Sequence, residues 1–184
     1  MELYLVAGAN GSGKTTLSKE ILGSKPNLYF LNSDELALEI NDRTGIKAGK
    51  LLLRRVDEYL NLNKAIVVES TISGNHHKHL IQKAREMGYQ IYLIYVFLDF
   101  LQINICRVKT RVLLGGHAVT EEDIIRRCIR SLKNFEKTKE IVDKWEVYHN
   151  INNTFEKIAY GNEHEIVLNQ ISYKLFKEIT QCGH

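Results

Sequence analysis

The feature that most constrains this chain is the stretch Gly8-Ala9-Asn10-Gly11-Ser12-Gly13-Lys14-Thr15, which matches the pattern GxxxxGK[ST] at every fixed position. An apolar segment over residues 2–7 precedes it, and a helical pattern runs from Lys14 to about Leu22. Glycines at such a junction let the backbone turn sharply, so that its N–H groups converge on an anion at the start of the helix. The stretch therefore predicts a strand, a phosphate-binding loop and a helix in direct succession.

The side chains of this loop predict that it binds a nucleoside triphosphate together with a metal ion. We expect Lys14 to neutralise the β- and γ-phosphates, the Thr15 hydroxyl to bind Mg²⁺, and Thr16 to reach the α-phosphate. ATP and Mg²⁺ are therefore the expected cofactors. The predicted nucleotide-binding residues are Gly8, Ala9, Asn10, Gly11, Ser12, Gly13, Lys14, Thr15 and Thr16.

Strand and helix patterns alternate along the whole chain. Apolar strand patterns occupy residues 2–7, 27–32, 64–70, 89–98 and 145–150, with a further candidate at 155–161. Helical patterns occupy residues 14–22, 33–40, 49–63, 76–88, 99–116, 120–143 and most of 165–179. Strands that are apolar nearly throughout indicate a mostly parallel sheet with helices on both faces. We predict an α/β fold of the P-loop NTPase type, formed as a single domain over residues 1–184.

Composition and charge limit the classes of function that remain. The chain has 25 basic and 22 acidic residues, a net charge of +3, which argues against a nucleic-acid partner. Its three cysteines form no CxxC pair, which favours a reducing, cytoplasmic setting. The start "MELYLVAGA" is expected to be a strand rather than a signal peptide, and no apolar run is long enough to cross a membrane.

Two carboxylates stand at predicted strand ends, where ligands bind in parallel α/β sheets. Asp34, in "FLNSDELA", is the candidate general base for an acceptor hydroxyl, with helix capping by Ser33 and Asp34 as the alternative role. Glu69, in "AIVVEST", is the candidate for ordering Mg²⁺ or binding the acceptor, and Thr71 follows at the same edge.

Two basic segments flank the stretch "LLGGHAVTEED" and predict a lid over the phosphates, at about residues 107–130. Guanidinium groups suit phosphate oxygens, and a glycine pair at residues 115–116 is a candidate hinge. The predicted catalytic set is Asp34, Lys14, Arg107, Arg111 and Arg126. The other cations of the predicted lid are Lys109, Arg127 and Arg130.

The cluster "HHKH" (His76, His77 and His79) lies at a helix start without acidic partners nearby in the sequence. We interpret it as a solvated helix face rather than a metal site.

The remaining sequence favours transfer of a phosphoryl group over the other uses of a nucleotide. The chain has neither the LSGGQ signature of transport ATPases nor the NKxD guanine selector of GTPases. A base, a metal-ordering acid and nearby cations are the parts that a phosphotransferase requires.

Taken together, several stretches resemble the compact bacterial zeta-toxin-like P-loop kinases. The stretches are "LYLVAGANGSGKTT", "FLNSDELA", "KAGKLLLRRVDEYL", "VVESTISG", "GYQIYLIYVFL", "RVKTRVLLGGHAVTEEDIIRRCIRSLKNF" and "WEVYHN", over about residues 2–150. The resemblance implies that Asp34 is the catalytic aspartate, that Glu69 and Thr71 line the acceptor side, and that Arg107 or Arg111 contacts the γ-phosphate. The sequence "GGH" stands near the place of the family's second arginine, so Arg126 or Arg127 is expected to substitute for it.

The resemblance also implies a substrate and a partner. Larger members of the family phosphorylate the 3′-hydroxyl of a UDP-N-acetylamino sugar, and an antitoxin protein blocks their ATP site. We therefore expect a small-molecule acceptor of the UDP-amino sugar type and a small antitoxin protein. The alternatives are a nucleoside or RNA-end kinase, and a non-catalytic ATP-binding toxin or regulatory module.

Overall fold

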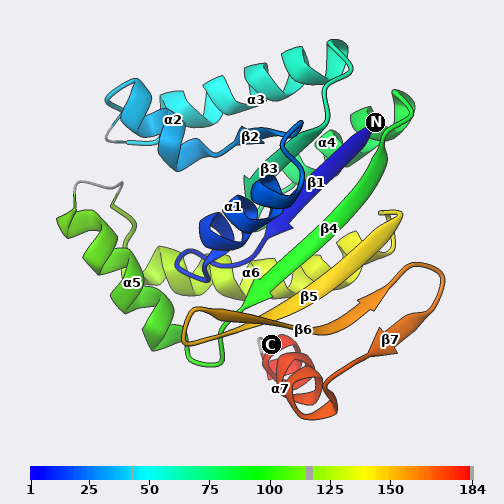
Figure 1. The fold of residues 1–184 in the computed structure, drawn as a ribbon. Coiled ribbons are helices and arrows are strands. Elements are labelled where there is room, and N and C mark those ends of the chain that lie inside the picture. Colours follow the sequence, from blue (N-terminus) through cyan, green and yellow to red (C-terminus); the bar gives the residue numbers. More distant parts are fainter. Residues whose placement is uncertain (43, 115–117, 183–184) are drawn as a thin grey trace.

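The computed structural model describes residues 1–42, 44–114 and 118–182. Seven strands form one sheet in the order β2-β3-β1-β4-β5-β6-β7 (Figure 1). The strands are β1 (Glu2–Ala7), β2 (Tyr29–Leu31), β3 (Ile66–Ser70), β4 (Gln90–Phe97), β5 (Lys144–Ile151), β6 (Thr154–Gly161) and β7 (Glu165–Val167). The first five strands are parallel, and β6 and β7 add antiparallel at one edge. The predicted α/β fold with a mostly parallel sheet is confirmed.

Helices cover both faces of the sheet, as Figure 1 shows. They are α1 (Lys14–Ser24), α2 (Ser33–Glu39), α3 (Ile46–Asn61), α4 (His76–Glu86), α5 (Leu101–Leu113), α6 (Glu121–Lys139) and α7 (Gln170–Cys182). No helix of the described ranges is both long and apolar enough to cross a membrane.

The two faces of β1 belong to two different apolar clusters, because successive side chains of a strand point in opposite directions. Leu3 and Leu5 join the larger cluster, which includes side chains of α3, α4, α6 and α7. Tyr4 and Val6 join the smaller cluster, in which Leu17 of α1 packs on the opposite face. Burial on both faces explains why the parallel strands read as continuous apolar runs.

One expectation about local structure is wrong. The cap of α2 is Asn32 rather than Ser33, since the Asn32 side chain accepts the N–H of Asp34 at 2.6 Å. The last helix, expected over most of residues 165–179, begins at Gln170, because residues 165–167 pair with β6 as the edge strand β7.

The predicted solvated face of the histidine cluster is also wrong at one position. The side chain of His77 is buried, and its Nε2 lies 3.1 Å from the Thr138 hydroxyl of α6. Burial lowers the pKa of His77 to about 4. The side of α4 that carries His77 faces α6, so this part of the polar sequence is buried.

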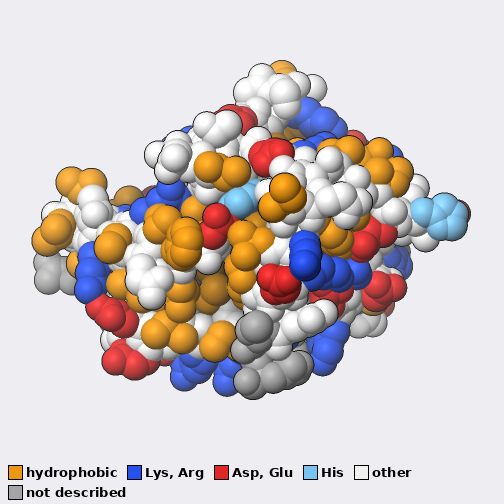
Figure 2. Space-filling model, turned by 90° about the horizontal axis from the view of Figure 1, so that it is seen from below, with side chains coloured by type: hydrophobic (Ala, Val, Ile, Leu, Met, Phe, Trp, Pro, Cys, Tyr) orange, Lys and Arg blue, Asp and Glu red, His pale blue; other side chains and the backbone are white. Residues whose placement is uncertain are grey.

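The side of the molecule that carries α7 is shown directly in Figure 2, with hydrophobic side chains gathered among charged ones. Exposed apolar residues in this C-terminal part include Ile166, Leu168 and Ile171.

The start of α3 is held by a carboxylate. One oxygen of Asp42 accepts the N–H of Ala48 at 2.9 Å, and the other accepts the hydroxyl of Thr44 at 2.7 Å. These hydrogen bonds, that from Ala48 foremost, lower the pKa of Asp42 to about 2. The charged carboxylate therefore sets where α3 begins.

We predict that Asp42→Ala lowers the urea midpoint of unfolding at pH 7. The folded-state pKa is lowered from 3.8 to about 2, so this stabilisation is present above about pH 4 and is lost as the pH falls through about 2. The difference from wild type should therefore shrink in acid. Asp57→Ala, which removes an exposed carboxylate of the same helix, is the control. A difference that stays constant from pH 7 to pH 2 would contradict this role.

Candidate active site

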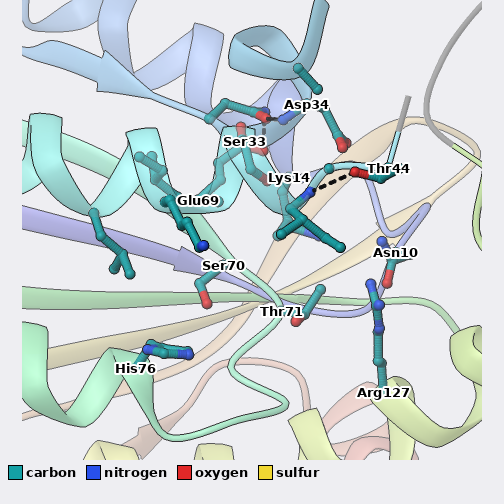
Figure 3. Close-up of a pocket in the computed structure, with 18 residues that line it drawn as sticks. Asn10, Lys14, Ser33, Asp34, Thr44, Glu69, Ser70, Thr71, His76 and Arg127 are labelled. Atoms are coloured by element: carbon teal, nitrogen blue, oxygen red, sulfur yellow. Dashed lines mark hydrogen bonds between the residues drawn. The ribbon is translucent and has the colours of Figure 1, made fainter. Parts of the chain in front are cut away.

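A cavity of about 820 Å³ opens at the carboxyl ends of β1, β2 and β3. Its walls come from the phosphate loop, α2, the first turns of α3, the end of β3, and single residues of α4 and α6. Figure 3 shows Lys14, Asp34, Glu69, Thr71 and Arg127 around this space. The sheet order brings these residues together, because β3 lies between β1 and β2.

The glycines of the phosphate loop are required by conformation and by space. Gly8, Gly11 and Gly13 have φ angles of 145°, 78° and 101°, which side chains rarely allow. A Cβ on Gly8 would lie 2.3 Å from the Val96 carbonyl, and one on Gly13 would lie 2.4 Å from the Asn150 amide. The loop is therefore packed tightly against the carboxyl ends of β4 and β5.

Two buried asparagines hold the carbonyls of the loop from outside. Asn104 of α5 donates to the carbonyl of Asn10 at 2.8 Å, and Asn150 of β5 donates to the carbonyl of Ser12 at 2.8 Å. With carbonyls engaged outward, the loop N–H groups are available to an anion on the inside. Neither asparagine was predicted as a site residue, because each reaches the loop from a distant part of the sequence.

Arg107 joins the loop to the turn between β5 and β6. Its Nη1 donates to the Gly11 carbonyl at 3.3 Å, and its Nη2 donates to the Asn153 side chain at 3.0 Å. This predicted lid residue therefore contacts the backbone of the phosphate loop.

Lys14 lies inside the loop and points its amine at the loop backbone. Its Nζ donates to the carbonyls of Gly8 and Ala9 at 3.0 and 2.8 Å. Burial lowers the pKa of Lys14, and the charges of Glu69 and Asp34 oppose that shift. A phosphate that arrives at the loop would offer this amine stronger, charged acceptors.

Glu69 is the centre of a hydrogen-bonded group at the end of β3. Its Oε2 accepts the hydroxyl of Thr15 at 3.0 Å and the amide of Asn32 at 2.7 Å. The residue is only 8% exposed, and burial raises the pKa of Glu69 against the opposing charge of Lys14. The hydroxyl and the carboxylate are hard oxygen ligands within one hydrogen bond of each other, and therefore fit Mg²⁺.

Asn32 connects this group to the candidate base. Its Nδ2 reaches both Glu69 and, at 3.3 Å, the Thr15 hydroxyl, while its Oδ1 accepts the N–H of Asp34. One buried amide thus ties together residues of three strand ends. A polar residue directly after a strand and two positions before Asp34 was the available signal in the sequence.

Asp34 extends from the first turn of α2 into the cavity and forms an ion pair with Arg111 of α5. This contact joins the candidate base to the predicted lid. Thr71 lines the same cavity, and its hydroxyl lies 2.9 Å from that of Ser73.

The loop after β3 is held in an unusual conformation. Ile72 has a φ of 44°, which is an outlier for a β-branched residue. Asn134 of α6 donates to the Ile72 carbonyl at 2.6 Å, and the Ser70 hydroxyl accepts the Ile72 N–H at 3.0 Å. This turn fixes the direction of Thr71, and strained backbone of this kind gathers at functional sites.

The structure separates two adjacent arginines of α6. Arg127 lines the cavity and lies opposite Asp34 in Figure 3. Arg126 is 57% exposed, pairs with Asp123 at 2.6 Å and does not line the cavity. Lys109 pairs with Glu121.

Two further residues predicted for the site lie away from the cavity, and the predicted hinge is not among the described residues. Thr16 and Arg130 are exposed and do not line the cavity. The candidate hinge at residues 115–116 lies outside the described residues.

Comparison with known proteins shows the family. A protein-family model described as the AAA domain matches residues 3–124. An uncharacterized protein of Haemophilus influenzae is 32% identical over 123 residues, which cover 65% of this chain and 86% of that protein. The chain belongs to the AAA-domain family.

Solved structures share the fold of the chain. A chain from the PezAT chromosomal toxin–antitoxin system of Streptococcus pneumoniae has a TM-score of 0.68 at 18% identity, covering 99% of this chain and 84% of its own. AvrRxo1-ORF1:-ORF2 with ATP has a TM-score of 0.71 at 15% identity, covering 97% and 63%. Shikimate kinase from Acinetobacter baumannii has a TM-score of 0.50 at 15% identity, covering 99% and 94%. The fold is that of P-loop kinases, and the resemblance to zeta-toxin-like kinases is confirmed at this level.

We predict that Asn32→Ala lowers the free energy of unfolding by about 1–3 kcal/mol, because it leaves the buried Glu69 carboxylate without its amide donor. Urea denaturation at pH 7 measures the change. Asn162→Ala, which removes an exposed asparagine from a bend, is the matched control. A loss no larger than that of the control would show that Asn32 does not hold the site together.

Proposed function

We propose that the protein is an ATP- and Mg²⁺-dependent kinase that phosphorylates a hydroxyl of a small acceptor, a UDP-N-acetylamino sugar. The observation that carries the proposal is that Lys14, Asp34 and Glu69 meet in one cavity of about 820 Å³. A site for ATP hydrolysis alone needs no second carboxylate and no additional space beside the phosphate loop.

Each residue has a role that follows from its chemistry. The loop N–H groups and Lys14 bind the phosphates of ATP. Thr15 and Glu69 would hold Mg²⁺, which neutralises charge on the β- and γ-phosphate oxygens. Asp34 accepts the proton of the acceptor hydroxyl. At the same time the hydroxyl oxygen of the acceptor bonds to the γ-phosphorus, and the bond between the γ-phosphorus and the departing ADP breaks.

The arginines stabilise the charge that develops on the transferred group. Arg127 lines the cavity, and Arg111 already contacts the candidate base. We propose Arg127, rather than the predicted Arg126, as the α6 residue in this role, because only Arg127 lines the cavity.

The proposal includes a partner and a compartment. A small antitoxin protein is the proposed partner, supported by the fold that the chain shares with a member of the PezAT toxin–antitoxin system. The proposed compartment is the cytoplasm, where ATP is abundant and the thiols of Cys106 and Cys128 stay reduced.

The test is mass spectrometry of nucleotide sugars, nucleosides and RNA ends incubated with Mg·ATP, with Lys14→Ala as the blank. Wild type should phosphorylate a UDP-amino sugar. Asp34→Asn should bind ATP as wild type does and lose transfer by roughly 10²–10⁴-fold, because it removes the general base. No product from wild type would reject the kinase, and a product only from nucleosides or RNA ends would reject the proposed acceptor.

A pair of neighbouring variants tests the arginine assignment. Arg127→Ala should lower kcat by roughly 10²–10³-fold, as expected when a donor to transition-state charge is removed. Arg126→Ala, which changes the adjacent exposed residue, should leave kcat within about twofold of wild type. Equal losses in both variants, measured as initial rates of ADP release with acceptor, would contradict the assignment.

A further inference from the structure

Gly49 is a helical glycine that neither its conformation nor its protein neighbours explain. It lies in the second turn of α3, where its N–H donates to the Gly45 carbonyl at 3.0 Å, and its φ is not positive. A Cβ built on Gly49 meets no atom of the described protein within 4 Å. Glycine weakens a helix relative to alanine, so nothing in the described protein favours glycine over alanine at this position.

Gly49 differs from Gly23, a second helical glycine with open space around it, because Gly49 forms part of the cavity wall. Ile46 and Leu53 line the same wall, one turn before and one turn after it, and are 65% and 44% exposed. Residues that are three or four apart share one face of a helix. The face of α3 toward the cavity is therefore bare backbone between two exposed apolar side chains.

The opposite side of the cavity is polar. Figure 3 shows Thr71, His76 and Arg127 there, with Asp34 and Lys14 toward the phosphate loop. A ligand between these walls would meet apolar surface on one face and hydrogen-bonding groups on the other. Rings of sugars and nucleobases have this character, with flat apolar faces and polar edges.

We propose that Gly49 is the specificity-determining residue of the acceptor subsite, and that the acceptor is a ring-bearing phosphate ester whose ring lies on the backbone at Gly49. The inference rests on the proposed kinase function, since it concerns the second substrate of that site. Ile46 and Leu53 contact the edges of the ring.

The phosphate of the acceptor is inferred from a cation at the same subsite. Lys50, the neighbour of Gly49 on α3, is exposed and lines the cavity. A lysine ammonium beside an apolar strip favours a ligand that carries negative charge beside its ring.

Even a methyl group at position 49 would displace such a ring. An acceptor in van der Waals contact with the backbone leaves no space for a Cβ, so the ring must move away from α3. Its hydroxyl then moves relative to Asp34, and a shift of about 1 Å can cost roughly 10²-fold in rate. The effect should fall on the acceptor and leave ATP binding unchanged.

The experiment compares Gly49→Ala and Gly49→Leu with the matched control Gly23→Ala. Gly23 also lies in a helix, a Cβ there also meets nothing within 4 Å, and it does not line the cavity. Titration calorimetry would measure binding of UMP, glucosamine 1-phosphate and UDP-N-acetylglucosamine to protein saturated with Mg²⁺ and a non-hydrolysable ATP analogue. Glycerol 3-phosphate is the acyclic comparison, and the panel separates nucleotides from sugar phosphates.

Wild type should bind at least one ring phosphate and bind glycerol 3-phosphate at least tenfold more weakly. Gly49→Ala should weaken binding of the ring phosphate by tenfold or more, and Gly49→Leu should abolish that binding. Gly23→Ala should leave the affinity unchanged. The inference is overturned if wild type binds no ring phosphate, or if both Gly49 variants bind it as tightly as wild type. Binding that depends on Gly49 without any phosphoryl transfer would uphold this subsite and reject the kinase function.

A second pair of variants tests the phosphate. Lys50→Gln should weaken binding of whichever ring phosphate wild type binds by tenfold or more, while leaving binding of the matching unphosphorylated compound (uridine, glucosamine or N-acetylglucosamine) unchanged. Lys47→Gln changes an exposed lysine of the same helix that does not line the cavity, and should have no effect. Equal weakening of binding by both variants would show that Lys50 acts only through the general positive charge of the surface. That result would contradict a specific contact between Lys50 and the phosphate.

Discussion

The buried carboxylate of Glu69 is the constraint on which the arrangement of the site depends. A carboxylate removed from water must be hydrogen-bonded, and here Asn32 and Thr15 supply the donors. Because Asn32 also caps α2, the same hydrogen bonds set the position of Asp34 relative to the phosphate loop. These hydrogen bonds therefore link the candidate base, the proposed Mg²⁺ ligands and the phosphate loop into one unit.

Much of this arrangement could be predicted from the sequence, because it depends on contiguous sequence patterns. The phosphate loop is a contiguous motif, and the apolar runs before Gly8, Asp34 and Glu69 mark the strands that carry them. In a parallel sheet, strand ends gather at one edge, so the phosphate loop and the two carboxylates were expected close together. The structure places Lys14, Asp34 and Glu69 around one cavity.

What could not be predicted depends on contacts between distant segments. Asn104 and Asn150 support the phosphate loop from 94 and 138 residues away, and nothing local distinguishes them from surface asparagines. Arg126 and Arg127 are neighbours on a helix, about 100° apart around its axis, so only the docking of α6 decides which one enters the cavity. His77 is buried for the same reason, since α4 and α6 pack together there.

In the proposed kinase, one cavity holds the donor phosphate and the acceptor hydroxyl, with Asp34 between them. A crystal structure with Mg²⁺ and a non-hydrolysable ATP analogue tests this most directly. We expect the Lys14 amine to leave the carbonyls of Gly8 and Ala9 for the phosphates, and the terminal phosphate to face the open cavity beside Asp34. A terminal phosphate that is walled off from Asp34, with no path to the space beside α3, would contradict it.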